Sequence, residues 1–412
     1  MYLGLIKVRK EFHSMNNIIN KYISENTEKS IVLEMHEYGL KQHEIMEFII
    51  RSFKPYFQST NLRAEQVLAY LPDYIDPLIN HLASPMNKKM VKECLKIYWE
   101  AKIKNPVLCF KSFGFWQEEF KASTSKIISL INLDQDRRKM SLPDFAEDVF
   151  AKIGTLIEAC IQPFLKLLTF LNRLIREKAV TCDMINQLKL GQIVGELIDC
   201  ADLEDLLIPT SFNLKLNQWR NIAKHDSFSV NENKIIGKYR INDNELEVVL
   251  LKPELWFIFE TVNDISSILK LTHAIFFFDN INEITPYWDN TELREESGIL
   301  TLIQLFNTHG LSTKSYSSEE DQIHFELCET STIIGYEERM NELLFLMRPI
   351  WFKSKKRYIS IHYYNEQDIL TLRIKTDTSL RRDIFSRGAQ TELITFENIR
   401  KCCKIEKLDH TL

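Results

Sequence analysis

This chain lacks several features that would place it in a familiar class of protein. No segment approaches the roughly 18 uninterrupted apolar residues of a membrane span, and the first residues, MYLGLIKVRKEF, lack the apolar core of a signal peptide. GxxxxGK[ST] and GxGxxG are both absent, so the sequence offers no standard loop for nucleotide phosphates. The eight cysteines show no CxxC pairing and are expected to be reduced thiols, mostly buried. We therefore expect a soluble cytoplasmic protein that does not enter a membrane.

An excess of positive charge is also missing. The formal net charge is -5, which argues against a chain that coats nucleic acid by its overall charge, so any contact with RNA or DNA must be local. At 412 residues and 45% hydrophobic content, the chain is long enough for two or three folding units.

Helical periodicity dominates the chain. Apolar residues recur at helical spacing from about residue 14 to 140, as in Ile45, Ile49 and Phe53, and further helices are expected up to residue 275. Beyond that point, strand-like and helical runs alternate. We therefore expect a mainly α protein with three consecutive parts: a helical N-terminal domain with a sensing or regulatory role (1–140), a helical bundle with an inserted β-hairpin (141–275) and an α+β domain (276–412).

Local signals define elements in the last two parts. Ser141 is placed as a helix N-cap, Pro163 is expected to kink or split the helix that follows, and Pro253 opens another helix. NKIIGKYRI, NDN and ELEVVLLK predict two strands joined by a tight turn. Further along, RYISIHYYNEQDILTLRIK predicts a hairpin, AIFFF and IHFELC predict strands, and helices are expected near 292–309, 336–347 and 391–404.

The stretch LNQWRNIAKH, residues 216–225, lies in an expected helix of about 213–225 with two unlike faces. At about 100° per residue, its apolar residues gather on one side and its polar residues share the other. A solvated helix face ending in a histidine that favours the helix dipole would explain this pattern. Basic residues concentrated in the helix and the hairpin after it favour a phosphate-attracting surface instead: Lys215, Arg220, Lys224, Lys234, Lys238 and Arg240.

RNIAKH, Arg220 to His225, resembles the R-x4-6-H signature of the HEPN superfamily, in which a polar residue, often Asn, follows the arginine. The surrounding layout, with two helices before the motif, a hairpin containing Gly237 after it and then a KPEL helix, is similar to several bacterial HEPN families. The resemblance covers about residues 141–275. It implies a HEPN-like four-helix bundle that acts as a homodimer, with the 213–225 helices of two subunits forming one composite cleft.

The resemblance further implies an endoribonuclease that needs no metal or other cofactor and acts as a toxin or antiviral (abortive-infection) effector, triggered by a phage or host protein. Cleavage through the RNA 2'-hydroxyl needs a base, an acid and positive charge at the phosphorane-like transition state. We assign proton transfer to His225, charge stabilisation in the transition state to Arg220, and the positioning of His225 or of the phosphate to Asn221. Glu196 is a candidate for orienting Arg220. RNA contacts are expected from Lys224, Lys215, Lys234, Lys238 and Arg240.

The alternative is a non-catalytic HEPN-like module that binds RNA, a nucleotide or a protein. Other candidates fit chemistry poorly. His36 and His43 lie seven residues apart and lack the i, i+4 spacing of a zinc-protease helix. Asp226 and the loop-like ENK segment (232–234) are spaced too closely to lie on two strands, as the acidic pair of a metal-dependent nuclease would. Near the C-terminus, adjacent cysteines do not match the usual spacing of zinc ligands in the group Cys402, Cys403 and His410. The sequence therefore assigns no metal site.

Overall fold

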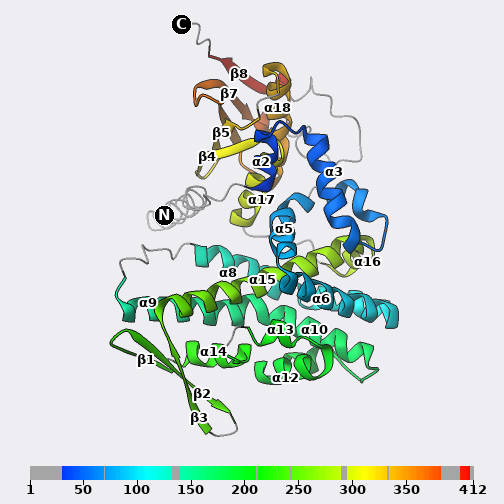
Figure 1. Cartoon of the computed structure of the whole chain (residues 1–412). Coiled ribbons are helices and arrows are strands. Elements are labelled where there is room, and N and C mark those ends of the chain that lie inside the picture. Colours follow the sequence, from blue (N-terminus) through cyan, green and yellow to red (C-terminus); the bar gives the residue numbers. More distant parts are fainter. Residues whose placement is uncertain are drawn as a thin grey trace, which may run out of the picture. The chain divides into compact units, whose positions relative to one another are not determined.

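The computed structural model describes residues 30–68, 70–131, 140–209, 212–225, 227–241, 244–288, 295–331, 334–381 and 400–408. Most of these residues are helical, and they also form a three-stranded and a five-stranded sheet (Figure 1). The prediction of a mainly α protein is therefore confirmed. All eight cysteines are free thiols, three of them buried.

Two compact units are present, and neither is continuous in sequence. The α/β unit comprises Met1–Ser52, Ala69–Asp76 and Leu293–Leu412, and the helical unit comprises Phe53–Leu68 and Pro77–Glu292. The boundaries expected at 140 and 275 both fall inside the helical unit. The reason lies in α6 (Pro85–Lys104), which buries one apolar stripe against α10 (Gln162–Ile175) and α15 (Lys252–Asp279) and so joins segment 1–140 to the bundle.

The helical unit consists of helices packed on one another and the three-stranded sheet. Its described elements are η1 (Lys54–Tyr56), η2 (Asn61–Arg63), α4 (Glu65–Leu68), most of α5 (Ile75–Ala83), α6, α7 (Pro106–Phe115), α8 (Gln117–Ile131), α9 (Leu142–Thr155), η4 (Leu156–Ile161), α10, α11 (Cys182–Asn186), α12 (Leu190–Ala201), α13 (Glu204–Leu207), α14 (Leu216–Lys224), β1 (Phe228–Asn231), β2 (Lys234–Ile241), β3 (Asn244–Leu250), α15, α16 (Ile281–Ile284) and η5 (Thr285–Tyr287).

Helix α15 extends further than expected. The AIFFF segment, residues 274–278, forms its last turns, so the predicted strand there is wrong. A short apolar run fits a buried helix as well as a strand, and here Phe276 stacks at 5.1 Å on Tyr98 and at 5.4 Å on Phe113. The ring of His273 lies 4.8 Å from Phe113 in the same aromatic core.

Helices α9 and α10 are joined end to end by η4, a π-helical turn. The hydroxyl of Ser141 accepts a hydrogen bond from the backbone N–H of Asp144 (3.3 Å), so the predicted N-cap is confirmed. Pro163 lies in the first turn of α10 and has no N–H for the carbonyl one turn earlier, and the wider π turn accommodates that loss without ending the helix. Among the described residues, Leu142–Ile175 is long and apolar enough to cross a membrane by length and composition, and 72% of its apolar window is buried inside the structure.

The predicted hairpin is present as β2 and β3, and β1 adds a third antiparallel strand that the sequence reading missed. The sheet lies against α14. A Cβ atom at Gly237 would stand 3.1 Å from Cγ1 of Val248 and 3.2 Å from Cγ2 of Ile222, so glycine permits this close approach.

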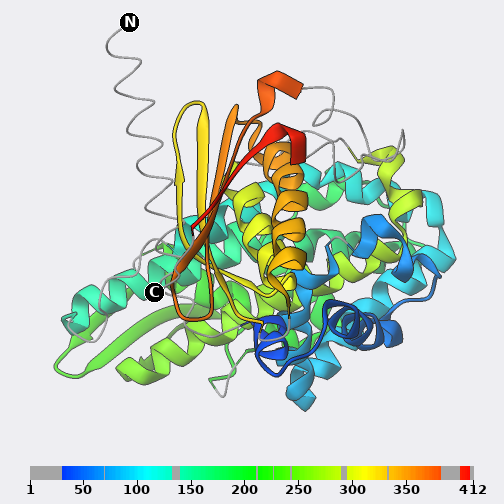
Figure 2. The same cartoon turned by 90° about the horizontal axis from the view of Figure 1, so that it is seen from above.

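In the α/β unit, two helices pack on one five-stranded sheet. Figure 2 shows α18 along one face of the strands. The described elements are α2 (Ile31–Glu37), most of α3 (Gln42–Phe53), η3 (Leu71–Tyr74), α17 (Glu295–Thr308), β4 (Leu311–Ser318), β5 (Gln322–Glu329), α18 (Tyr336–Ser354), β6 (Tyr358–Tyr364), β7 (Leu370–Asp377), η6 (Thr378–Arg381) and β8 (Cys403–Lys407).

The strand order is β4-β5-β6-β7-β8, and only the β5–β6 pair is parallel. The predicted strand at IHFELC and the predicted β6–β7 hairpin are confirmed. The helix expected at 391–404 falls mostly outside the described residues, and Cys403 begins strand β8. One sheet face carries Phe325, Ile361 and their neighbours into the core under α17 and α18.

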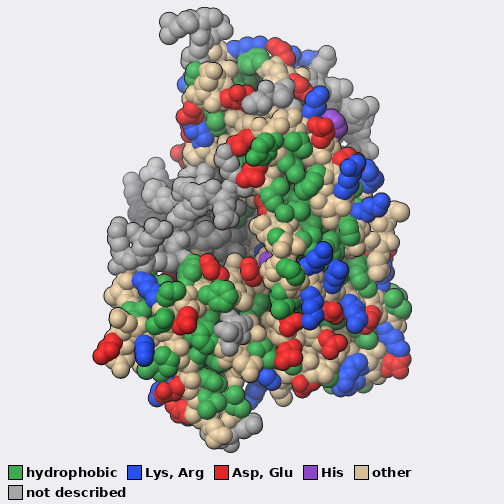
Figure 3. All heavy atoms as spheres, in the orientation of Figure 1, with side chains coloured by type: hydrophobic (Ala, Val, Ile, Leu, Met, Phe, Trp, Pro, Cys, Tyr) green, Lys and Arg blue, Asp and Glu red, His purple; other side chains and the backbone are tan. Residues whose placement is uncertain are grey.

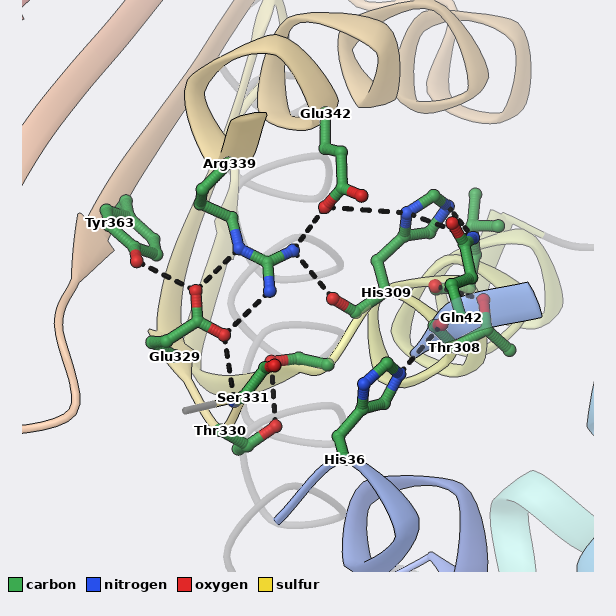
Figure 4. Close-up of polar contacts among 12 residues, drawn as sticks. His36, Gln42, Thr308, His309, Glu329, Thr330, Ser331, Arg339, Glu342 and Tyr363 are labelled. Atoms are coloured by element: carbon green, nitrogen blue, oxygen red, sulfur yellow. Dashed lines mark hydrogen bonds and ion pairs between the residues drawn. The ribbon is translucent and has the colours of Figure 1, made fainter. Parts of the chain in front are cut away.

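A buried ion-pair network ties these elements together (Figure 4). Arg339, only 1% exposed, donates through Nε and Nη2 to the carboxylate of Glu329 and through Nη1 to Glu342 and to the carbonyl of His309. The hydroxyl of Tyr363 also donates to Glu329 (2.8 Å). Four of the five N–H groups of the guanidinium therefore donate to acceptors within the protein, and the network joins β5, the residue that follows α17, α18 and β6.

Candidate active site on helix α14

Helix α14 has the two faces that its sequence predicts. Leu216, Trp219 and Ile222 are fully buried. The backbone N–H of Lys215 donates to the side chain of Gln218 (2.6 Å), which caps the start of the helix, and His225 follows its last residue as the C-cap. Helix α14 packs against α9, α12 and β2 through its apolar face, so its polar face is left at the surface.

The polar face brings the predicted motif residues together. Nη1 of Arg220 donates to Oδ1 of Asn221 (3.2 Å) and lies 3.5 Å from Nε2 of His225. Asn221 and His225 are exposed, and the Arg220 side chain is 30% exposed. The guanidinium carries only N–H groups, so in a hydrogen bond between these two side chains Nε2 of His225 is the acceptor.

A carboxylate that the sequence reading missed holds the guanidinium. Oε1 of Glu158 accepts a hydrogen bond from Nε of Arg220 (2.7 Å) and also pairs with Nη2, while Oε2 lies 3.1 Å from Nζ of Lys224. Although partial burial acts to raise the pKa of Glu158, hydrogen bonds from Lys224 and Arg220 and their positive charges lower it overall. Glu158 is therefore an ionised anchor for both cations.

The π turn and a glycine place Glu158 within reach. Glu158 lies in η4, and π turns inside α-helices are frequent at functional sites because they redirect side chains. One turn earlier, a Cβ atom at Gly154 would be 3.2 Å from Cβ of Ala223 and 3.1 Å from Cε of Lys224. The glycine thus lets α14 approach the α9–η4 segment closely enough for the ion pairs to form.

The expectation that Glu196 orients Arg220 is wrong. Glu196 lies on α12 and forms a two-pronged ion pair with Arg173 of α10, at 2.9 Å from Nε and 2.6 Å from Nη2. The reason is the packing of α12 on α10, which faces Glu196 toward Arg173 and leaves Arg220 to Glu158.

The basic residues around the motif are less concentrated than expected. Lys215 precedes α14 at the end opposite His225, ten residues and therefore about 15 Å away along the helix axis. Lys238 lies 3.6 Å from both Glu245 and Glu247 across the hairpin, and Arg240 lies 3.9 Å from Glu245. Lys234 is exposed at the start of β2. The acidic strand β3 thus offsets part of the expected positive surface.

The other sequence candidates lie elsewhere. His36 is buried and its Nε2 contacts the carbonyl of Thr308 (3.1 Å), whereas His43 is exposed on α3. Cys402 and Cys403 precede and begin β8. Glu232 and Asn233 of the ENK segment form the turn between β1 and β2, with Glu232 at φ 51°, and Lys234 begins β2. Asp226 and His410 lie outside the described residues.

The arrangement can bind an anion and move a proton. Glu158 immobilises one edge of the guanidinium. The Nη1 atom at the other edge is directed toward the exposed side chains of Asn221 and His225. A guanidinium held in this way can donate to a phosphate oxygen while the adjacent imidazole accepts or releases a proton. No protein-family model, curated protein or solved structure matches the chain.

Proposed function

We propose that the protein is a metal-independent endoribonuclease of the HEPN type, acting in the cytoplasm as a toxin or antiviral effector. The observation that carries the proposal is the 3.5 Å approach of Arg220 to His225 on an exposed helix face, with Arg220 anchored by Glu158. The proposed HEPN-like bundle comprises α9 with α10, α12, α14 and α15, with the β-sheet inserted before α15.

The proposed reaction uses the RNA's own 2'-hydroxyl. His225 removes the proton from this hydroxyl as its oxygen attacks the adjacent phosphorus, and the 5'-oxygen leaves after receiving a proton. Arg220 donates to the phosphate oxygens, where negative charge accumulates in the transition state, and Asn221 positions Arg220 through the 3.2 Å hydrogen bond. The products are a 2',3'-cyclic phosphate and a 5'-hydroxyl.

A second copy of the chain would complete the site. The reaction needs a base and an acid, and the described residues around α14 supply one imidazole, His225. Two α14 helices facing each other across a twofold axis would supply two imidazoles and two guanidinium groups. The outer half of the hairpin supports a homodimer, because Ile241 is 43% and Leu246 is 40% exposed on the sheet face that continues from the α14 contact.

The remaining parts of the chain are assigned to control. The bundle accounts for only part of the helical unit, and the α/β unit has a separate core. We assign to these parts the recognition of a phage or host trigger protein and restraint of the nuclease.

The test is cleavage of single-stranded and structured RNA by purified protein in EDTA. We expect Arg220→Ala and His225→Ala to lower the rate by about 10² to 10⁴. The controls are His43→Ala and Arg176→Ala, which remove an exposed histidine and an exposed arginine outside the motif. Both variants should cleave RNA at the wild-type rate. Intact RNA with the wild-type protein, or equal cleavage by His225→Ala, would reject the proposal.

A second candidate function, RNA binding without cleavage, is favoured by a separate groove in the helical unit. Lys88, Lys92 and Lys96 project from successive turns of α6 into a groove of about 560 Å³ that Tyr56 and Trp99 also line. Figure 3 shows lysine and arginine side chains gathered over the region of α6, toward the right of the view. Lysines spaced along a groove with aromatic rings suit a single strand, whose phosphates and bases they can contact.

The salt dependence of RNA binding tests whether the lysines of this groove contact the RNA. For single strands, each phosphate contact contributes about 0.7 to the slope of log K against log salt. Replacing the three lysines by Ala should therefore reduce the slope by about 2, while His225→Ala should leave it unchanged. Binding by the wild type without products supports the second candidate, and an unaltered slope in the triple variant excludes the groove.

A further inference from the structure

The parallel strands β5 and β6 place three potential metal ligands on one face of the α/β sheet. Alternate residues of β5 and β6, such as Phe325 and Ile361, fill the core. The intervening residues point to the opposite face, and the register aligns Glu326 with His362 and His324 with Ser360. Two imidazoles and one carboxylate therefore meet on neighbouring strands.

The three groups are close enough to share one ion. One ligand atom from each of His324, Glu326 and His362 lies within 4.8 Å of the others, and all three residues are half-buried. The two imidazole rings are 4.3 Å apart, nearly perpendicular at 74°. Zinc bonds of about 2.0–2.2 Å place tetrahedral ligands about 3.4 Å apart, so small side-chain rotations would close the site.

Neighbouring hydroxyl groups hold the ligands in place. Nδ1 of His324 lies 2.7 Å from Oγ of Ser360, which leaves Nε2 to face an ion. The Glu326 carboxylate accepts hydrogen bonds from Ser315 (2.7 Å) and from Tyr364 (3.0 Å), one on each oxygen. Such outer hydrogen bonds orient metal ligands in proteins and tune their affinity.

We propose that His324, Glu326 and His362 bind a divalent zinc ion with one coordination position open. Two nitrogens and one carboxylate oxygen are a donor set that zinc prefers, and three protein ligands leave a fourth position for water or an exogenous ligand. Positive charge lies nearby, since Arg373 is aligned with His362 and Lys375 follows on the same face, and Nη1 of Arg373 lies 3.7 Å from the carboxylate of Glu406 on β8. Nε of Arg373 is buried and has no hydrogen-bond partner within the described part of the chain.

The site is separate from the residues proposed for RNA cleavage, which belong to the helical unit. A sequence signal did exist, because IHFELC places His324 and Glu326 at alternating positions of one predicted strand and RYISIHYY places His362 in another. The pairing of the two strands in parallel, which brings the histidines together, is a property of the fold.

The test is metal binding by the full-length protein. After dialysis against Zn²⁺, elemental analysis should find one tightly bound zinc per chain, and Co²⁺ in its place should give a visible spectrum without a thiolate charge-transfer band. We expect His324→Ala and His362→Ala to weaken the affinity at least about 100-fold, and Ser315→Ala or Tyr364→Phe to weaken it about 10- to 100-fold.

Two variants serve as matched controls. Cys328, two residues beyond Glu326 on the same face, and the exposed His43 should be dispensable, so Cys328→Ser and His43→Ala should bind normally. Absence of bound zinc in the wild-type protein, unchanged affinity in both histidine variants or a thiolate band would overturn the assignment. The wild-type result decides even if a variant fails to fold. RNA cleavage in EDTA reports on the proposed nuclease independently.

Discussion

Replacement of Glu158 by Gln should affect the catalytic rate, through the position of Arg220, more than it affects the free energy of unfolding. Glutamine keeps the size and one acceptor but loses the charge that holds Nε of Arg220 at 2.7 Å and Nζ of Lys224 at 3.1 Å. Because these side chains are about a third exposed, solvent screens the ion pairs, and the unfolding free energy should fall by less than about 1 kcal/mol.

The effect on catalysis should be larger than the effect on stability. Fixing Arg220 for the transition state corresponds to about 1 to 2 kcal/mol, so its loss should lower kcat/KM by about 5- to 30-fold. The loss should appear mainly in kcat, because the charge that Arg220 stabilises develops only in the transition state. Glu158→Asp, which keeps the charge, should recover part of the rate.

Glu196→Gln is the matched control, because Glu196 holds Arg173 in an equivalent two-pronged ion pair away from the motif. The assay is steady-state cleavage of a short fluorescent RNA, with chemical denaturation of each variant alongside. Wild-type kcat in Glu158→Gln, or an equal loss in Glu196→Gln, would refute a positioning role for Glu158.

Three further predictions concern packing and protonation. In denaturant titrations, Gly154→Val should lower the free energy of unfolding by about 1 to 3 kcal/mol, because the larger side chain overpacks against α14. Gly195→Val is the control, because a Cβ atom at Gly195 has no neighbour within 4 Å and should carry no overpacking penalty. Arg339→Ala should lower the free energy of unfolding by about 3 to 5 kcal/mol because it leaves a buried carboxylate unpaired. In the same titrations Arg357→Ala, which removes a solvent-screened ion pair with Asp377, should have a much smaller effect. Burial lowers the pKa of His273 to about 3, so the folded protein favours the neutral ring: stability is complete above about pH 6.5 and falls as the pH drops toward 3, at about 1.4 kcal/mol per pH unit. His273→Phe should remove this contribution to the pH dependence of the free energy of unfolding. The same pH dependence in the variant as in the wild type would contradict the role given to His273.

The local part of the candidate site could be predicted from the sequence. Helical periodicity alone separates Trp219 and Ile222 from Arg220, Asn221 and His225, because the angle between residues on a helix is fixed. The hairpin followed from its alternating residues and its turn. These features depend on neighbours within about ten residues.

The partners of these residues could not be predicted in the same way. Glu158 reaches Arg220 across 62 residues of sequence, through a π turn and a close helix contact at Gly154 that have no local signature. The same limit applies to the compact units: α6 belongs with α10 and α15 because its buried stripe matches theirs, which no composition change marks.

The most direct measurement of the central claim is the chemistry of the RNA ends. Mass spectrometry of fragments formed in EDTA should find 2',3'-cyclic phosphates and 5'-hydroxyls with the wild-type protein and with His43→Ala, and neither with His225→Ala. Fragments with 5'-phosphates, or the same fragments from His225→Ala protein, would contradict the assignment of proton transfer to His225.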